Sequence, residues 1–325
     1  MATNILTISN PNFENECKKI HDSFEDFNQL IPFLTSRTQH ERQQIRETYK
    51  AIYGEDFRSL LQKYESGFSP MTYSALSMLI LDPHERDAIV SMEALEQDVT
   101  NFKVLVEIFV GRKSSHILLI KQAYQKLFRR QLDQDIINLE PPHPYQKILV
   151  ALSTSHKSHH VDVSQHIAKC DARRLYETGE GGRGAIEEAV VLEILSKRSI
   201  PQLKLTISSY KHIYGHAYSK SLKRGNYGEF EKALKMMVKC ISDPPNHYAK
   251  ILYTSIKGAT SQKATLVQVL VSRAEVDMDE IQRLFKKKYG KELIDVICES
   301  IPCGDYKDFL VSLAARTTST VLLQK

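Results

Sequence analysis

Apolar residues recur at helical spacing in four stretches of the chain, and each stretch ends at an arginine. The arginines are Arg37, Arg112, Arg198 and Arg273. Apolar residues stand seven, four and three positions before each of them, which places them on one face of a helix. These residues are Leu30, Phe33, Leu34, Leu105, Ile108, Phe109, Val191, Ile194, Leu195, Leu266, Val269 and Leu270. The pattern predicts four amphipathic helices, each ending at its arginine.

A second helix is predicted after each arginine, because aromatic residues follow twelve and sixteen positions later. These are Tyr49 and Tyr53, Tyr124 and Phe128, Tyr210 and Tyr214, and Phe285 and Tyr289. Residues four apart share one helix face, so we expect both members of each pair to be buried. Glycines that favour a left-handed helix end follow in three cases, and Arg129 stands in the other. The three glycines are Gly54, Gly215 and Gly290.

The spacing of the arginines shows four repeats of unequal separation. Successive arginines are 75, 86 and 75 residues apart, so the repeats are larger than the common short helical repeats. Further helical runs in each repeat, and few strand-like alternations, predict about five helices per repeat and an all-α protein. The longer middle spacing suggests two pairs of repeats joined by a polar linker. The polar linker region also holds four histidines (His156, His159, His160 and His166), and a solvated connector is favoured there over a transition-metal site.

Composition narrows the class of protein without naming a function. Hydrophobic residues make up 42% and charged residues 26%, which is ordinary for a globular chain. No run of about 18 apolar residues and no signal-peptide pattern is present, so we expect a cytoplasmic protein. The five scattered cysteines fit reduced thiols in that compartment. The net charge of +5 is too small to distinguish lipid from nucleic acid as a partner.

Several long motifs resemble the annexins, particularly those of plants. They include TSRTQHERQQIRETYKAIYGEDF, LDPHERDA, VLVSRAEVDMDEI and CGDYKDFL. The resemblance covers nearly the whole chain, and it implies a slightly curved disc of four five-helix repeats. It also implies that the convex face meets anionic phospholipid through bound calcium. On this basis we expect the repeats at 1–83, 84–155, 167–244 and 245–325, with a linker at 156–166.

The calcium sites that the resemblance implies are incomplete in this sequence. The family loop is Gly-any-Gly-Thr, whose carbonyls bind calcium together with a carboxylate later in the repeat. The loop positions 22–25 and 97–100 of repeats one and two contain no glycine. Repeat four keeps the best candidates, and repeat three comes second: Ile256, Gly258, Thr260 and Glu299, then Gly182, Gly184 and Glu187.

The acid that closes each calcium site is missing from its expected place. The equivalent positions are Tyr64, Leu139, Gly225 and Ser300. In three repeats a glutamate stands one residue away: Glu65, Glu140 and Glu299. We therefore expect calcium binding to be weak or absent, and the alternative is that these loops are ordinary helix connections.

Basic residues near the implied sites suggest another route to a membrane. In repeat three the resemblance implies that Lys223 and Arg224 flank the place of the lost acid, with Arg183 opposite, and Lys257 lies in the repeat-four loop. Arginine and lysine can bind lipid phosphate without a metal, although solvated loop charges are the competing interpretation. A calcium-insensitive helical scaffold for protein partners is the second functional hypothesis.

Three other kinds of function are disfavoured. The stretch from Gly179 to Gly184 matches a dinucleotide-binding fingerprint, but it follows a helical segment instead of a strand. Ser36 stands where a histidine discussed for catalysis in plant annexins would be, and Val110 replaces the cysteine partner of Cys240. We therefore expect no catalysis and no nucleic-acid partner.

Overall fold

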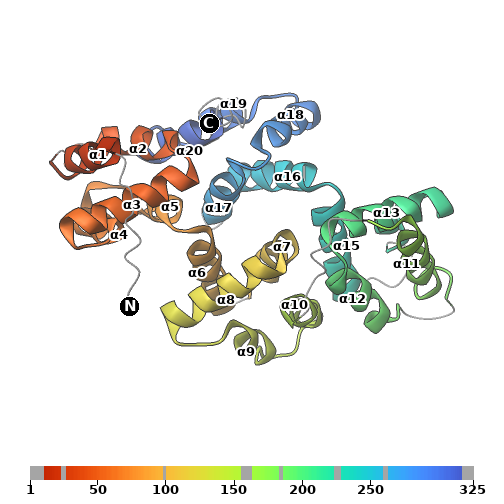
Figure 1. The fold of residues 1–325 in the computed structure, drawn as a ribbon. Helices are drawn as coiled ribbons and strands as arrows, with labels where there is room; N and C mark the ends of the chain where they lie inside the picture. Colours follow the sequence, from red (N-terminus) through yellow and green to blue (C-terminus); the bar gives the residue numbers. More distant parts are fainter. Residues whose placement is uncertain are drawn as a thin grey trace. The chain divides into compact units, whose positions relative to one another are not determined.

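The computed structural model describes residues 11–22, 27–97, 100–154, 163–182, 186–222, 228–258 and 263–316. Within these ranges the chain forms twenty α-helices and one short 3-10 helix, and it contains no strand (Figure 1). The helices follow one another in four groups of five, one group for each arginine-anchored repeat. The predicted all-α class is confirmed.

Each repeat contributes five consecutive α-helices to the fold. Repeat one contains α1 (Pro11–Asp22), α2 (Phe27–Ser36), α3 (Gln39–Tyr53), α4 (Phe57–Lys63), η1 (Glu65–Gly67) and α5 (Pro70–Ile80). Repeat two contains α6 (Pro83–Glu96), α7 (Phe102–Gly111), α8 (Ser114–Phe128), α9 (Leu132–Ile137) and α10 (Pro144–Thr154). Repeat three contains α11 (Gln165–Glu177), α12 (Glu188–Lys197), α13 (Ile200–Tyr214), α14 (Tyr218–Ser221) and α15 (Glu229–Ser242). Repeat four contains α16 (Pro244–Lys257), α17 (Lys263–Arg273), α18 (Met278–Tyr289), α19 (Leu293–Ser300) and α20 (Asp305–Ala314).

The anchor arginines stand at the ends of the second helices, as their spacing predicted, and each one meets a carboxylate. Arg37 pairs with Glu16 at 2.7 Å, and Arg112 donates to Asp87 at 2.5 Å. Arg198 holds both oxygens of Asp171, at 2.7 and 3.0 Å. In these three repeats the acid belongs to the first helix of the repeat, whereas Arg273 turns to Asp277 in the loop that follows α17. The repeated arginine therefore fixes the end of the second helix by an ion pair.

The aromatic pairs of the third helices are only partly as expected. The first ring of each pair is fully buried: Tyr49, Tyr124, Tyr210 and Phe285. The second ring is half-buried, because it lies one turn further along, at the helix end. In three repeats that second ring stacks on a ring of the first helix, with centroids 3.9 to 4.0 Å apart: His21 with Tyr53, Tyr176 with Tyr214, and Tyr253 with Tyr289.

The third helices end in left-handed residues. Gly54, Gly215 and Gly290 have φ angles of 74°, 75° and 72°. Arg129 takes the same place at the end of α8 with φ of 58°. Glycine adopts this conformation without a steric penalty, whereas an arginine there is strained.

The helices pack into two compact units, and the first combines repeat one with repeat four. It spans Met1–Pro83 and Pro245–Lys325. Helix α2 packs on α20, and α5 packs on both α17 and α20. A polar cluster joins the two repeats, in which Glu275 accepts hydrogen bonds from the Gln39 backbone at 2.8 Å and from the buried Arg42 at 3.0 Å. Arg316 approaches the same carboxylate at 3.4 Å.

The second unit, His84–Pro244, combines repeats two and three. Helices α7 and α10 pack against α15, and α13 lies against α11 and α15. The compact units therefore differ from the pairs that the arginine spacing suggested, namely one with two and three with four. Linker length describes sequence only, whereas the units follow from which apolar faces meet. Most of the linker lies outside the described residues.

Candidate functional site

The loops between the first and second helices, where calcium is expected, fall partly outside the described residues. Of the candidates, Thr260, Gly184, Arg183, Lys223 and Arg224 lie outside them. The described candidates are Ile256, Gly258, Glu299 and Lys257 of repeat four, and Gly182 and Glu187 of repeat three. The geometry can therefore be followed best in repeat four.

In repeat four a lysine contacts the carbonyls that end the first helix. The Lys263 ammonium, at the start of α17, donates to the backbone oxygens of Ile256 at 2.8 Å and Ser255 at 3.2 Å. Burial lowers the pKa of Lys263. Ile256 is one of the residues whose carbonyl the sequence assigned to calcium, and its oxygen already has a cationic donor. Gly258 follows directly after α16 and is half-buried.

Lysines also contact the carboxylate of the repeat-four site and the hydroxyl beside it. Both carboxylate oxygens of Glu299, near the end of α19, accept hydrogen bonds of 2.8 Å from the Lys291 ammonium. The Lys257 ammonium donates to the hydroxyl of the next residue, Ser300, at 2.9 Å. The hydrogen bond from Lys291 lowers the pKa of Glu299, and the charges of Lys291 and Lys257 add to this effect. Glu299 is therefore ionised but already neutralised.

These contacts decide how well the described oxygens of repeat four fit calcium. Calcium takes six to eight oxygen ligands at about 2.3–2.6 Å and tolerates no ammonium group among them. The Ile256 carbonyl, the Glu299 carboxylate and the Ser300 hydroxyl each accept from a lysine. In this arrangement the described oxygens do not fit calcium, since the ion would have to displace these lysines first.

In repeat three the glycine-rich loop is held by its own backbone. The Gly181 and Gly182 amides donate to the carbonyls of Tyr176 at 2.8 Å and Gly179 at 3.1 Å. A Cβ atom at Gly181 would lie 2.4 Å from the Tyr176 ring, so this position needs glycine for close approach. Glu187 precedes α12, is exposed, and donates its amide to the Thr178 carbonyl at 2.9 Å.

The same loop contains a carboxylate that contacts a histidine beyond the end of α13. Glu180 accepts a hydrogen bond of 2.7 Å from the His216 ring, with the Tyr210 hydroxyl at 3.4 Å. Burial raises the pKa of Tyr210 to about 12, so this hydroxyl stays protonated and can donate. No sequence pattern singles out Glu180 or His216, because they are 36 residues apart and follow different helices.

Repeats one and two contain fewer candidate calcium ligands. Tyr64 ends α4, and the neighbouring Glu65 opens η1 with its side chain exposed. Leu139 is half-buried, and Glu140 is exposed. No group of three or more histidine, cysteine or acidic side chains suited to a metal occurs in the described part of the chain. Three of the four linker histidines lie outside that part.

The residues that sequence reasoning missed are Lys263 and Lys291. Lys263 comes directly after the loop, in the first position of the next helix, and Lys291 is eight residues before Glu299. A search for cations within one helical turn of each implied ligand would have flagged Lys263. The contact of Lys291 depends on the turn between α18 and α19, which the sequence pattern leaves open.

Comparison with known proteins agrees with this geometry at the level of the family. The annexin family model matches residues 17–69, 86–152, 170–237 and 247–313. Human annexin A13 is 35% identical over 285 residues, which cover 87% of this chain and 88% of the relative. Four five-helix repeats with this match define the class, and the chain belongs to the annexin family.

Solved structures show the same fold. The structure of annexin III superposes with a TM-score of 0.84 and 31% identity, covering 94% of this chain and 95% of that one. Chicken annexin V gives a TM-score of 0.75 and 29% identity, covering 93% and 95%. Annexins are known for calcium-dependent binding to anionic phospholipid membranes, to which they attach peripherally. None of the helices in the described ranges is long and apolar enough to span a bilayer.

Proposed function

We propose that this annexin is a peripheral phospholipid-binding protein whose dependence on calcium is weak or lost. The observation that carries the proposal is the set of three lysine contacts on the repeat-four oxygens, with Lys263 at 2.8 Å from the Ile256 carbonyl. An ammonium in that place supplies positive charge permanently, whereas calcium would supply it only when bound. Calcium remains the candidate cofactor, with low affinity.

The candidate ligands keep their assignment as a proposal. In repeat four they are Ile256, Gly258, Thr260 and Glu299, and in repeat three they are Gly182, Gly184 and Glu187. The proposed lipid-binding residues are Arg183, Lys223, Arg224 and Lys257. Each basic side chain at an anionic surface contributes about 1 kcal/mol, which supports weak and reversible attachment. We also propose repeat boundaries at residues 83, 155, 167 and 244, and a plant-type annexin, on the sequence motifs alone.

Two finer points accompany this proposal. We propose a cytoplasmic location, which the five free cysteines support. We also propose that the protein has no catalytic activity and no nucleic-acid partner, because no reactive constellation was found in its sequence.

A protein-binding scaffold is the second candidate, and several exposed apolar side chains support it. Four apolar side chains on α8 and α9 of the second unit are exposed: Leu118, Leu119, Leu127 and Ile137. Leu118 is the most open of them, at 56%. Exposed apolar side chains are a common feature of protein-binding surfaces, and Leu118 and Leu119 are adjacent on α8.

Vesicle sedimentation separates the two candidates. The full chain is mixed with phosphatidylserine-rich vesicles in a chelator and in calcium, with phosphatidylcholine vesicles as control. The proposal expects binding to the acidic vesicles in both conditions, weakened by salt and changed little by calcium. Failure to sediment in either condition would reject the membrane function and favour the scaffold. Binding only in calcium would keep the membrane function and reject its calcium independence.

A further inference from the structure

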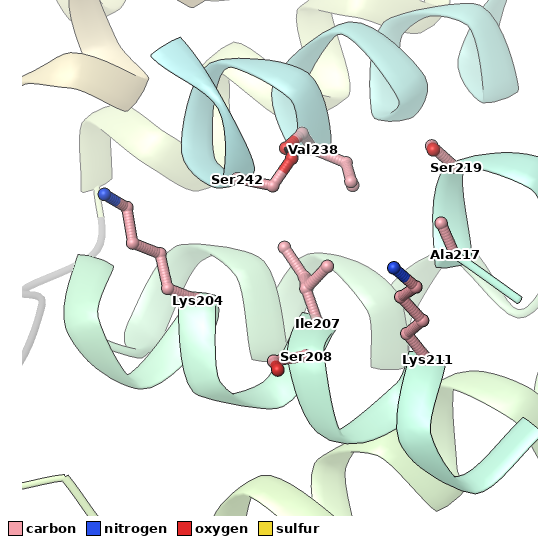
Figure 2. A pocket seen from close by; sticks show the side chains of 8 residues that line it. All are labelled: Lys204, Ile207, Ser208, Lys211, Ala217, Ser219, Val238 and Ser242. Atoms are coloured by element: carbon pink, nitrogen blue, oxygen red, sulfur yellow. Dashed lines mark hydrogen bonds between the residues drawn. The ribbon is translucent and has the colours of Figure 1, made fainter. Parts of the chain in front are cut away.

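A hollow of about 300 Å³ opens among α13, α14 and α15, within the second unit. Its lining residues are Lys204, Ile207, Ser208, Lys211, Ala217, Ser219, Val238 and Ser242. Figure 2 shows Ile207 between the two lysines on α13, with Val238 and Ser242 facing them from α15. The hollow shares no residue with the candidate calcium and lipid-binding sets, and its volume suits a small molecule.

The two lysines are the charged groups of this hollow. Lys204 and Lys211 are seven residues apart on α13, which places them on one helix face about 10 Å apart along the axis. Both are exposed, and neither forms an ion pair or a side-chain hydrogen bond with any residue that the structure describes. Elsewhere in this unit, exposed lysines do find acids, as Lys147 finds Glu188 at 2.7 Å.

No acid lies nearby in the sequence to neutralise these lysines. Between Glu193 and Glu229 the chain contains no aspartate or glutamate, while it contains seven lysines and arginines. The lining of the hollow likewise contains no carboxylate. The lining therefore carries two positive side chains and no negative one, which favours anions as ligands.

The remaining lining residues combine an apolar floor with hydroxyl groups. Ile207 and Val238 are buried and close the bottom of the hollow. Ser208, Ser219 and Ser242 supply hydroxyls around it, and the Ser242 hydroxyl donates to the Val238 carbonyl at 2.7 Å, which leaves its oxygen free to accept.

We propose that this hollow binds a small hydroxylated ligand with two phosphate groups, one for each lysine. Phosphate oxygens accept charge-assisted hydrogen bonds from ammonium groups, and ligand hydroxyls match the serines. Such a ligand can be a free inositol or sugar phosphate, or the headgroup of a phosphorylated inositol lipid. The inference does not rest on the proposed membrane function, because a soluble phosphate would bind without a bilayer.

Isothermal titration of the full chain with inositol trisphosphate tests the site. We expect one binding event for the parent and at least about a tenfold loss of affinity for K204Q/K211Q, since losing a charge-assisted hydrogen bond is enough for that factor. The control K126Q/K169Q removes two exposed lysines of the same unit and should bind as the parent does. S208L fills the hollow without changing the charge and should also weaken binding, with unfolding curves confirming that each variant folds.

Vesicles of phosphatidylcholine with a minor fraction of phosphatidylinositol bisphosphate, used in a chelator, identify the source of the phosphate. If K204Q/K211Q loses affinity for both probes, the site binds the lipid headgroup as well as its soluble form. If it loses affinity for the soluble probe alone, the site binds a free phosphate. The inference is overturned if the parent binds neither probe, or if K126Q/K169Q weakens binding as much as K204Q/K211Q. It is also overturned if S208L leaves the affinity for the soluble probe unchanged.

Discussion

Arg129 ends α8 in a left-handed conformation, whereas a glycine has this conformation at the equivalent position of the other three repeats. The strain of a side chain there is roughly 1–2 kcal/mol, and an arginine with φ of 58° carries it without a compensating ion pair among the described residues. Arg129→Gly should therefore raise the free energy of unfolding by about 1 kcal/mol, part of the strain being offset by the greater entropy of unfolded glycine. Urea unfolding measures the difference.

Gly54→Ala is the matched control for this prediction. A Cβ atom at Gly54 would meet no atom within 4 Å, so the change tests backbone conformation alone at φ of 74°. It should lower stability by about 1 kcal/mol. If Arg129→Gly destabilises the protein, the conformational explanation of these helix ends is wrong.

At this scale the sequence predicted the helix ends well. The glycines at three equivalent positions, and an arginine at the fourth, identified the left-handed residues because the conformation is a local property. It predicted the buried first aromatics as well. It did not predict the lysine contacts at Ile256 and Glu299, since these join side chains of different helices through the tertiary fold.

At the scale of elements, Asp305 connects the start of α20 with the start of α5. Its carboxylate accepts from the Ser69 amide at 3.0 Å and from the Tyr306 amide at 2.8 Å. Burial alone would raise the pKa of Asp305, but the hydrogen bonds from the Ser69 and Tyr306 amides and from the Thr72 and Ser69 side chains outweigh it, so the net pKa is lowered. A carboxyl whose folded pKa is lowered stabilises the fold above its unfolded pKa, and this stability is lost as the pH falls through the folded pKa.

Asp305→Asn should lower the free energy of unfolding by about 1 kcal/mol at neutral pH, a value that allows for solvent screening of a partly exposed group. The difference from the parent should shrink as the pH falls below about 4. There the aspartate of the unfolded chain is protonated first, and the aspartate of the folded protein is protonated at lower pH. Urea unfolding at several pH values measures this. Asp308→Asn, an exposed change on the same helix, is the control and should change the free energy of unfolding by less than about 0.5 kcal/mol at neutral pH. A difference for Asp305→Asn that stays constant with pH would refute the assignment.

Glu275 is the second connection between elements of repeats one and four. Its carboxylate receives Arg42, whose side chain is 2% exposed, and lies 3.4 Å from Arg316, at 7%. Glu275→Gln should lower stability by at least about 2 kcal/mol, because two buried guanidinium groups lose their counter-charge. Glu280→Gln, which breaks an exposed pair with Arg283, should change stability by less than about 0.5 kcal/mol. Equal effects of the two changes in urea unfolding would contradict this account.

At the scale of the whole molecule, the repeat number and the order of helices were predictable, whereas the partnership of the repeats was not. Arg42 and Glu275 are 233 residues apart, and no local sequence pattern predicts that they form an ion pair. Repeats one and four therefore form one compact unit although they are the most distant in sequence. The same reason explains why the missing acids were visible in the sequence, whereas the lysine contacts on the Ile256 and Glu299 oxygens were not.

Lysines occupy the repeat-four oxygens that calcium would use, and we expect this to keep calcium binding weak. Calcium titration calorimetry of the parent and of K263M/K291M tests it most directly, with K250M/K287M as a control that removes two exposed lysines from the same unit. We expect binding no tighter than the millimolar range for the parent and the control, and at least about tenfold tighter binding for K263M/K291M, because the Ile256 and Glu299 oxygens become available. Micromolar calcium binding by the parent, or no gain in K263M/K291M, would contradict the account.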